Sequence, residues 1–380
     1  MDFSWTKDQL ELREKAITFA KQRLNDDLLE NDMRGELPRE KWLACAEFGA
    51  QGIIIPGQYG GTGLDILTAV LVMESLGYGC KDNGLLLSIN VNIWNCAVPI
   101  LHFGTELQKS SYLPGLCNGS LVGAYGMTEP ESGSDAFSLK TTAIAQGDHY
   151  VLNGSKTLIT NAPCADVVVA FAKVPQDSGK DKISCFIIEK GTPGLLLGNK
   201  IDKMGLRTSP FGEVVFQDCA VSANNLLGKE GQGQAIFNDA LAEERAFILS
   251  SQVGAMERQI AECISYAKTR RQFNKKIFDF QSVSNMLADM KVRLETSRLL
   301  VYKVAWLRQQ GIRAFMESSM AKLYISECCV QNSISAMRIH GGYGYTTEFE
   351  HERQLRDALG GILYSGTSEI QRNIIAELLD

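Results

Sequence analysis

Several features of large protein classes are missing from this chain of 380 residues. It has no run of lysine or arginine and a net charge of −6, so the basic stripe that a phosphate backbone requires is absent. Its ten cysteines include no CxxC pair, and no histidine lies at ligand spacing. No strand-GxGxxG-helix unit supports a Rossmann-type dinucleotide site. We therefore expect no nucleic-acid partner, no metal, and free buried thiols.

Leader and membrane signals are also lacking. The N-terminal stretch MDFSWTKDQLELREK mixes acidic and basic residues and has no apolar centre. The longest apolar run that we identify, 66–73, is too short to cross a bilayer. The content of 45% hydrophobic and 22% charged residues is ordinary for a globular protein. We expect a cytoplasmic protein without a membrane partner.

Helical and strand-like patterns divide the chain into three parts. Residues 1–120 begin with the capping box TKDQ at Thr6 and continue with helical periodicity. Residues 121–230 carry short β-branched and aromatic runs, such as DVVVAFAKV and KISCFIIEK, and an Asn153-Gly154 dipeptide that predicts a hairpin turn. Residues 231–380 return to long helices. The expected fold is α+β, with a helical domain, a β-domain and a C-terminal helical bundle.

The segment GAYGMTEPESGSD, residues 123–135, places small residues and hydroxyls around one turn. Its glycines Gly123, Gly126 and Gly133 would let the backbone approach a flat ligand, and Tyr125, Thr128 and Ser134 offer hydroxyl groups. The alternative is an ordinary loop rich in Gly, Ser and Pro.

Four motifs in order extend this interpretation to the whole chain: GAYGMTEPESGSD, LNGSKTLITNA, YAKTRRQFNKKIFDFQ, and RIHGGYGYTTE running into LYSGTSEIQR. Together with the α-β-α order they resemble the acyl-CoA dehydrogenase family. The resemblance implies FAD as cofactor and a homotetramer in which neighbouring subunits share each flavin. Positions that match flavin-contacting residues of the family are Tyr125, Met127, Thr128, Gly133, Ser134, Leu158, Thr160, Arg270, Phe273, Gln281, Arg338, His340, Gly341, Gly342, Thr367 and Glu369.

The chain departs from the family pattern at three places. Ser365 stands where many members have the catalytic glutamate, which implies either an inactive protein or a base supplied from elsewhere. Leu158 replaces an aromatic residue that often covers the flavin. Arg338 and His340 replace the residues that usually precede the paired glycines; for His340 a structural role is favoured over a cation that helps oxygen react with reduced flavin.

One helix offers a substitute base. In FNDALAEERAFILSS the residues Phe237, Leu241, Glu244 and Ile248 share an apolar stripe, whereas Glu243 is expected on a more exposed face. Burial raises the pKa of a carboxyl group, which suits a general base. The isovaleryl-CoA branch of the family resembles this arrangement, with its base on this helix immediately before an arginine. The alternative for Glu244 is a buried ion pair within the bundle.

Removal of a proton alpha to a thioester carbonyl by Glu244, with a hydride equivalent passing to the flavin, is therefore the predicted reaction. Substrate contacts are assigned to Ser134, Trp94, Arg245 and Ser365. The alternatives are a core position for Trp94, which is the commoner role of a tryptophan on a helix, and a plain turn residue at Ser365, which is the favoured interpretation there. The overall sequence resembles the prolyl-carrier-protein oxidase branch. That resemblance implies oxidation of a prolyl thioester on the phosphopantetheine arm of an acyl or peptidyl carrier protein.

Other interpretations stay open. The pantetheine arm could belong to coenzyme A, in a short- or branched-chain acyl-CoA dehydrogenase that uses an electron-transfer flavoprotein. The less covered flavin implied by Leu158 favours O₂ as acceptor instead. Two further classes are a flavin monooxygenase supplied with reduced flavin, which would not need Glu244, and a non-catalytic scaffold, which would explain Ser365 most simply.

Overall fold

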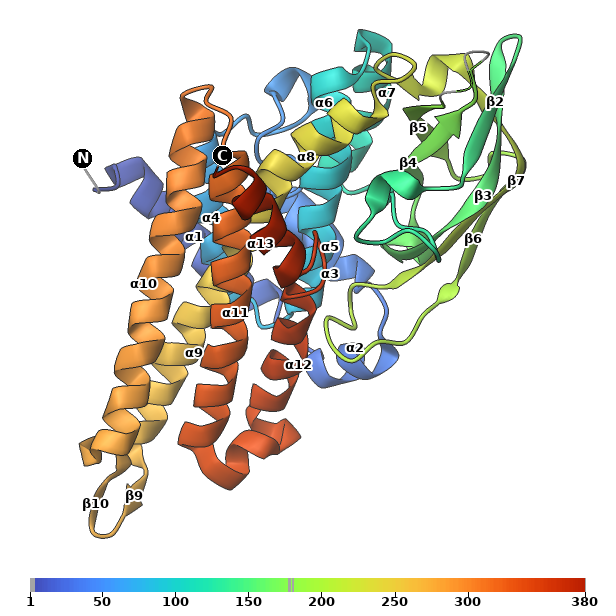
Figure 1. Ribbon diagram of the computed structural model, residues 1–380. Coiled ribbons are helices and arrows are strands. Elements are labelled where there is room, and N and C mark those ends of the chain that lie inside the picture. The colour runs from blue at the N-terminus through green and yellow to red at the C-terminus, as the bar shows by residue number, and fades with distance from the viewer. Residues whose placement is uncertain (1–3, 177–178, 180, 380) are drawn as a thin grey trace.

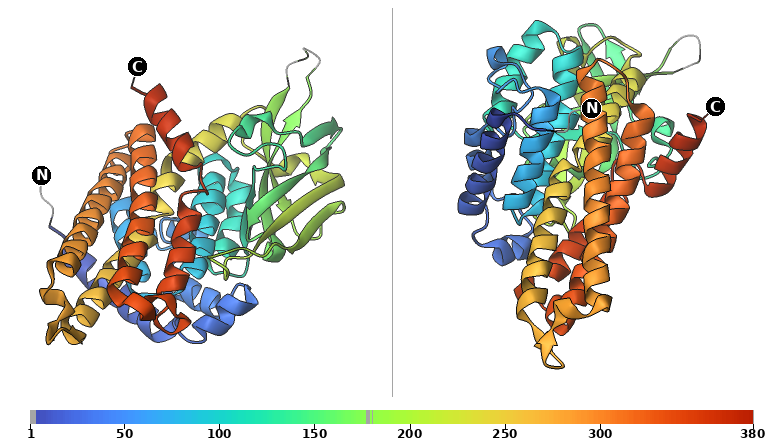
Figure 2. Two further views of the ribbon diagram at one scale, coloured as in Figure 1. Left: turned by 60° about the horizontal axis from the view of Figure 1, so that its bottom comes forward. Right: turned by 90° about the vertical axis from the view of Figure 1, so that its left-hand side faces the viewer.

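The computed structural model describes residues 4–176, 179 and 181–379, so the first residues of the N-terminal stretch lie outside the described part. Helices from the two ends of the chain pack together into one helical body, and the sheet formed by the middle of the chain lies against one side of it (Figure 1). Both rotated views show the same separation of sheet and helices (Figure 2). The predicted α+β architecture in the order α, β, α is confirmed.

The N-terminal helices are α1 (Lys7–Arg23), α2 (Leu28–Arg34), α3 (Arg39–Phe48), α4 (Ile66–Gly79), α5 (Asn83–Asn90), α6 (Val98–Phe103) and α7 (Glu106–Cys117), with the π-helical segment η2 (Val91–Ala97) joining α5 to α6. The predicted capping box is present: the Thr6 side chain accepts from the Gln9 backbone and the Gln9 side chain from that of Thr6.

Residues 66–73, expected to be the longest apolar run, are exceeded by another helical segment. Residues 83–103 form a continuous helix of 21 residues that is long and apolar enough to cross a membrane by length and composition. Within the fold, 94% of its apolar window is buried. It is the central helix of the core, and its burial accounts for its apolar composition.

The middle of the chain forms an eight-stranded sheet within the described residues, in the order β6-β7-β3-β2-β4-β5-β8, with β1 paired in parallel to β4. The strands are β1 (Gly123–Gly126), β2 (Thr142–Gln146), β3 (His149–Thr160), β4 (Val167–Val174), β5 (Lys182–Glu189), β6 (Leu195–Lys200), β7 (Phe211–Ser222) and β8 (Leu226–Leu227).

The predicted hairpin turn at Asn153-Gly154 is wrong. Both residues lie inside β3, where the register against β7 shifts between Leu152 and Gly154, so the dipeptide forms a β-bulge. The turn that joins β2 to β3 lies at Gly147, which has φ 64°. Pairing with β7, which is distant in sequence, overrides the local turn signal.

The C-terminal bundle consists of α8 (Gly233–Phe247), α9 (Ser250–Thr269), α10 (Gln281–Gln309), α11 (Phe315–His340), α12 (His351–Gly361) and α13 (Ser368–Glu377). A short hairpin, β9 (Arg271–Gln272) with β10 (Lys275–Lys276), joins α9 to α10 at the lower tip of the bundle in Figure 1.

Two glycines let helices of the N- and C-terminal parts cross closely. A Cβ built on Gly254 of α9 would lie 1.8 Å from the carbonyl oxygen of Glu74 on α4, and one on Gly77 would lie 1.8 Å from that of Ser251. Only glycine permits such backbone proximity. This crossing fixes α4 against α9 and joins the helices of the two terminal parts into one body.

Candidate active site

Glu244 lies on α8 with only 2% of its surface exposed. Leu241 and Ile248, its predicted neighbours on the apolar stripe, are buried as well. Its carboxylate forms no ion pair with any described residue, and its Oε2 atom is buried without a hydrogen-bond partner. The buried ion pair considered as an alternative is therefore absent from the described residues, and one carboxylate oxygen is left for a ligand.

Ser365 makes the other contact of this carboxylate. Its hydroxyl donates a hydrogen bond to Glu244 Oε1. The residue has φ 58°, a left-handed conformation that is uncommon outside glycine and is stabilised here because the Gln371 amide donates to the carbonyls of Ser365 and Gly366, each at 3.0 Å. Ser365 is thus part of the site, which the plain-turn alternative did not anticipate.

Burial raises the pKa of the Glu244 carboxyl, while the hydrogen bond from Ser365 and the charges of Arg245 and Lys322 act in the opposite direction. The Arg245 Nε and the Lys322 Nζ are themselves buried and lack partners among the described residues. Burial lowers the pKa of the Lys322 ammonium to about 8. Glu244 is therefore a desolvated carboxyl near two cations but bonded to neither, which suits proton transfer near neutral pH.

Two more polar side chains at this site have a buried atom without a partner among the described residues. Asn95 lies on η2, which packs against α8, and it lowers the pKa of Glu244 as a hydrogen-bond donor while its own Oδ1 has no partner. The Tyr125 hydroxyl is also buried and unpartnered. Trp94 is fully buried, donates to Asn90 Oδ1 at 3.1 Å and packs on Phe247 at 4.9 Å between ring centroids. These contacts make Trp94 a core residue behind the site, which agrees with the alternative interpretation of this residue.

The expectation that Glu243 faces a more exposed direction is wrong. Its exposure is 2%, and its carboxylate accepts from Arg308 Nε at 3.0 Å. Arg308 belongs to α10, which covers this face of α8. The two adjacent glutamates thus differ sharply, because Glu243 is held by a cation and Glu244 is not.

Beside Glu244, the ends of β1 and β3 form one edge of the sheet domain. Met127 is buried, Thr128 and Thr160 are half-buried, and the Thr157 N–H donates to the Thr128 carbonyl at 2.9 Å. Below them Lys156 donates to Glu129 at 2.7 Å, and both side chains are buried. This ion pair, which sequence analysis missed, anchors the segment after β1.

Glycines of the 123–135 segment have different surroundings from those expected. A Cβ on Gly123 would lie 2.8 Å from Cys96 Sγ, and one on Gly126 would lie 3.2 Å from Lys156 Cγ, so both admit protein neighbours rather than a ligand. Only Gly133 is open, with nothing within 4 Å of the built Cβ. It and the adjacent Ser134 are exposed.

Leu158 lies at a second register shift of β3, has φ 57° and is 54% exposed. A branched apolar side chain in this backbone conformation is strained, and strain of this kind is typical of functional positions. Together with the unpartnered Tyr125 hydroxyl and the open Gly133, this edge fits a flat, partly polar ring system.

The remaining predicted cofactor residues are divided between two places. Thr367 and Glu369 lie near Ser365: Thr367 is the N-cap of α13, its hydroxyl accepts from the Ile370 N–H at 3.3 Å, and Glu369 is exposed in the first turn. Seven others lie at the tip of the bundle, namely Arg270, Phe273, Gln281, Arg338, His340, Gly341 and Gly342. On α11, Lys322 and His340 are 18 residues apart, about 27 Å along the axis. One chain therefore does not bring these seven residues to Glu244.

His340 is built into the protein by hydrogen bonds and stacking. Its Nδ1 donates to the Ala336 carbonyl at 2.9 Å, its Nε2 lies 3.2 Å from Nε2 of His351, and its ring stacks on Tyr266 at 4.2 Å. Burial lowers the pKa of His340 to about 4, so the ring is neutral at pH 7. These contacts agree with the structural role favoured for it.

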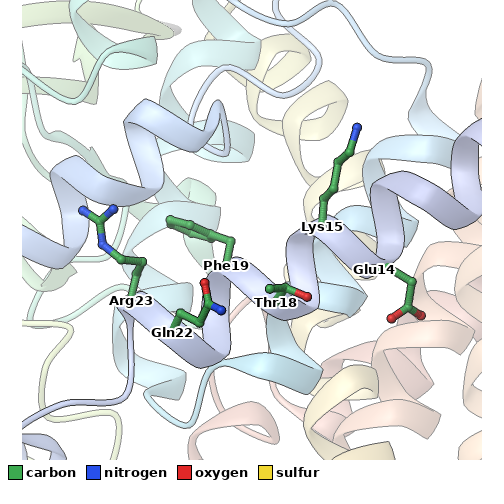
Figure 3. A pocket seen from close by; sticks show the side chains of 6 residues that line it. All are labelled: Glu14, Lys15, Thr18, Phe19, Gln22 and Arg23. Carbon is green, nitrogen blue, oxygen red and sulfur yellow. The ribbon is translucent and has the colours of Figure 1, made fainter.

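Asn95 and Lys322 were missed because nothing in the local sequence distinguishes them from other helical residues. The four asparagines within the apolar helix 83–103 were the available signal for Asn95. A separate surface hollow, lined by Glu14, Lys15, Thr18, Phe19, Gln22 and Arg23, involves α1 alone and includes none of the predicted residues (Figure 3). Among the described residues no cluster of His, Cys, Asp or Glu could hold a metal.

Comparisons with known proteins cover nearly the whole chain. The acyl-CoA dehydrogenase N-terminal, middle and C-terminal domain families match residues 6–120, 124–219 and 231–379. An L-prolyl-[peptidyl-carrier protein] dehydrogenase of Pseudomonas fluorescens is 42% identical over 89% of this chain and 90% of its own length. A short-chain acyl-CoA dehydrogenase of Clostridium acetobutylicum is 38% identical over 99% of both chains.

Similarity to solved structures is equally extensive. The crystal structure of the prolyl acyl carrier protein oxidase AnaB is 49% identical, has a TM-score of 0.97, and is matched over 99% of this chain and 100% of that chain. The three family matches span both helical parts and the sheet between them. This chain therefore belongs to the acyl-CoA dehydrogenase family of FAD-dependent enzymes.

Proposed function

We propose that this protein oxidises a small acyl thioester, an L-prolyl group carried on the phosphopantetheine arm of a carrier protein, to the pyrroline-carboxyl thioester. The observation that carries the proposal is the buried Glu244 carboxylate, which has one oxygen bonded to Ser365 and the other free. Similarity to prolyl carrier-protein dehydrogenases supports the choice of acyl group.

Glu244 takes the proton from the α-carbon of the acyl group. The free Oε2 receives it, and burial supplies the basicity that this step needs at neutral pH. The hydride equivalent leaves from the neighbouring ring atom, so two hydrogens are lost and one double bond forms. Ser365 holds the carboxylate in place and stabilises its charged form before the proton is taken.

FAD, when bound, supplies the hydride acceptor. Tyr125, Met127, Thr128 and Thr160 would hold its ring system at the ends of β1 and β3, with Leu158 at its edge. The segment of Gly133 and Ser134 and the α13 start at Thr367 and Glu369 flank the same region. The strained Leu158 backbone and the open Gly133 support this placement. Arg245 is placed beside the base, where its charge opposes the rise in the pKa of Glu244.

The cofactor site is completed by a second copy of the chain in a homotetramer. The residues at the bundle tip are remote from Glu244 of the same chain, and Phe273 there is 88% exposed at φ 51°, which is unusual for a large aromatic side chain. Exposed Val292, Leu299 and Trp306 recur every seven residues along α10 and offer an apolar face for assembly.

Oxygen is the proposed electron acceptor, because Leu158 is exposed where it would leave the flavin edge uncovered. The second candidate is a short-chain acyl-CoA dehydrogenase that passes electrons to an electron-transfer flavoprotein, favoured by the similarity to the clostridial enzyme. Hydrogen peroxide formed during aerobic turnover would support the first; a strict need for the flavoprotein would support the second. We propose a cytoplasmic location, consistent with ten free cysteines, nine of them buried.

The decisive experiment mixes the oxidised, yellow protein anaerobically with prolyl-carrier protein, isovaleryl-CoA or butyryl-CoA and follows loss of flavin absorbance. We expect rapid bleaching by prolyl-carrier protein and not by isovaleryl-CoA or butyryl-CoA. The Glu244→Gln variant should keep its flavin spectrum and lose bleaching by at least about a thousandfold. Bleaching by Glu244→Gln at the wild-type rate would exclude Glu244 as the base and favour the monooxygenase interpretation.

A further inference from the structure

Four buried asparagines occur in the apolar helix 83–103: Asn83, Asn90, Asn92 and Asn95. Burying a side-chain amide is unfavourable unless its donors and acceptor are paired. The Asn90 amide is satisfied within its own helix, and the Asn92 amide bonds to the backbones of Gly123 and Leu116. Asn83 and Asn95 each leave the side-chain oxygen without a partner among the described residues. The Asn83 NH₂ donates to Asp357 of α12, whereas Asn95 lies on η2, which packs against the helix of Glu244.

The unused oxygen of Asn95 belongs to a side chain that borders the proposed reaction site. Asn95 lies on η2, which packs against α8, and its side chain lowers the pKa of Glu244 as a hydrogen-bond donor would. An ionised carboxylate can only accept, so the Asn95 NH₂ is the group that acts on Glu244 and Oδ1 is the free atom. Asn95 is also in the π-helical segment Val91–Ala97, a distortion that is common at functional sites. A buried acceptor is therefore available beside the proposed base.

We infer that Asn95 Oδ1 accepts a hydrogen bond from an N–H of the acyl group and makes Asn95 a specificity-determining residue for aminoacyl thioesters over hydrocarbon acyl thioesters. The inference rests on the proposed function and specifies how the acyl group is chosen. The ligand class is an acyl group whose amine is attached to the α-carbon.

Proximity of the two groups supports this role. The amine nitrogen of a prolyl group is bonded directly to the α-carbon that Glu244 deprotonates, so an acyl group placed for proton transfer brings its N–H close to Asn95. A carbocyclic acyl group of the same shape would fill the same space and leave Oδ1 buried and unpaired. Such an unpaired acceptor disfavours the analogue by about tenfold to a hundredfold.

A matched substrate pair isolates this contact: prolyl-carrier protein and cyclopentanecarbonyl-carrier protein differ by one N–H in place of a CH₂. We would measure anaerobic rates of flavin bleaching with both, for the wild type and for Asn95→Leu and Asn95→Ala. The rate ratio of prolyl to cyclopentanecarbonyl substrate should fall at least tenfold in both variants, mainly through loss of the prolyl rate. An unchanged ratio, or an equal loss with both substrates, would overturn the inference.

Two variants of different volume guard against packing artefacts, and each must keep the flavin spectrum of the wild type. The Tyr125→Phe variant removes the other unpartnered buried oxygen near Glu244 while keeping the ring stacked in its aromatic cluster. If the ratio of prolyl to cyclopentanecarbonyl rates fell in Tyr125→Phe and stayed unchanged in both Asn95 variants, Asn95 would not be the acceptor. A wild type that fails to bleach with prolyl-carrier protein would refute the proposed function, whereas a bleaching wild type with an unchanged ratio in both variants would refute only the role of Asn95.

Discussion

Removing the Ser365 hydroxyl tests the electrostatic argument for Glu244 directly. The hydroxyl donates to Glu244 Oε1, and Glu244 Oε2 has no hydrogen-bond partner among the described residues. A hydrogen bond to a charged group contributes about 1.5–3 kcal/mol, and one pKa unit corresponds to 1.36 kcal/mol. Because Ser365 stabilises the charged form, Ser365→Ala should raise the pKa of Glu244 by about one to two units.

The consequence appears in the pH dependence of flavin bleaching. A base must be ionised to act, so raising its pKa moves the acidic limb of the rate profile to higher pH by about one to two units. Ser368→Ala is the matched control, since Ser368 begins α13 three residues after Ser365 and its hydroxyl donates to a different carboxylate, that of Glu327 on α11, at 2.7 Å. Stopped-flow reduction between about pH 5 and 9 would give both profiles. An acidic limb that stays in place in Ser365→Ala, or moves equally in Ser368→Ala, would refute the reasoning.

Three further predictions concern stability. Lys156→Met leaves the Glu129 charge buried and unpaired and should lower the free energy of unfolding by about 3–5 kcal/mol in urea titrations. Lys140→Met, which breaks an exposed pair with Glu131, should leave that free energy nearly unchanged, and similar losses in the two variants would contradict the argument. Gly254→Ala forces α4 away from α9 and should lower the free energy of unfolding by about 1–3 kcal/mol. Gly57→Ala, whose built Cβ meets nothing within 4 Å, should change it little. Equal thermal midpoints for the two variants would contradict this prediction. Burial lowers the pKa of His340 from its ordinary 6.5 to about 4, so on acidification the imidazole of the unfolded chain is protonated before that of the folded chain. The free energy of unfolding should therefore fall by up to about 3 kcal/mol as the pH drops from about 6.5 to 4. The His340→Phe variant should show a weaker dependence of this free energy on pH.

Local patterns in the sequence predicted those parts of the site that depend on one element. The apolar stripe on α8 identified Glu244 as buried, because helical periodicity is a property of the segment itself. The same pattern placed Glu243 wrongly, since the burial of that carboxylate depends on Arg308, 65 residues later in the chain. Likewise, the Ser365–Glu244 bond joins residues 121 positions apart, which no local pattern can reveal.

Turn and glycine signals failed for a related reason. Asn153-Gly154 is a typical hairpin dipeptide, but the long pairing of β3 with β7 absorbs it as a bulge. Gly123 was expected to admit a ligand, yet it admits Cys96 from the central helix. Composition identified the class of each segment, whereas the tertiary neighbours decided the role of each single residue.

The β9–β10 hairpin lies far from α8, at the tip of the helical bundle (Figure 1). In the proposed homotetramer, a substitution in one of these regions and a substitution in the other could therefore be carried by different subunits. A chain with Glu244→Gln and a chain with a damaged Phe273 turn, each inactive by itself, would then rescue one another when co-expressed. In the mixed oligomers, some active sites would combine an intact Glu244 from one variant with an intact hairpin from the other. Such mixed alleles would behave genetically as complementing, although both map to a single gene.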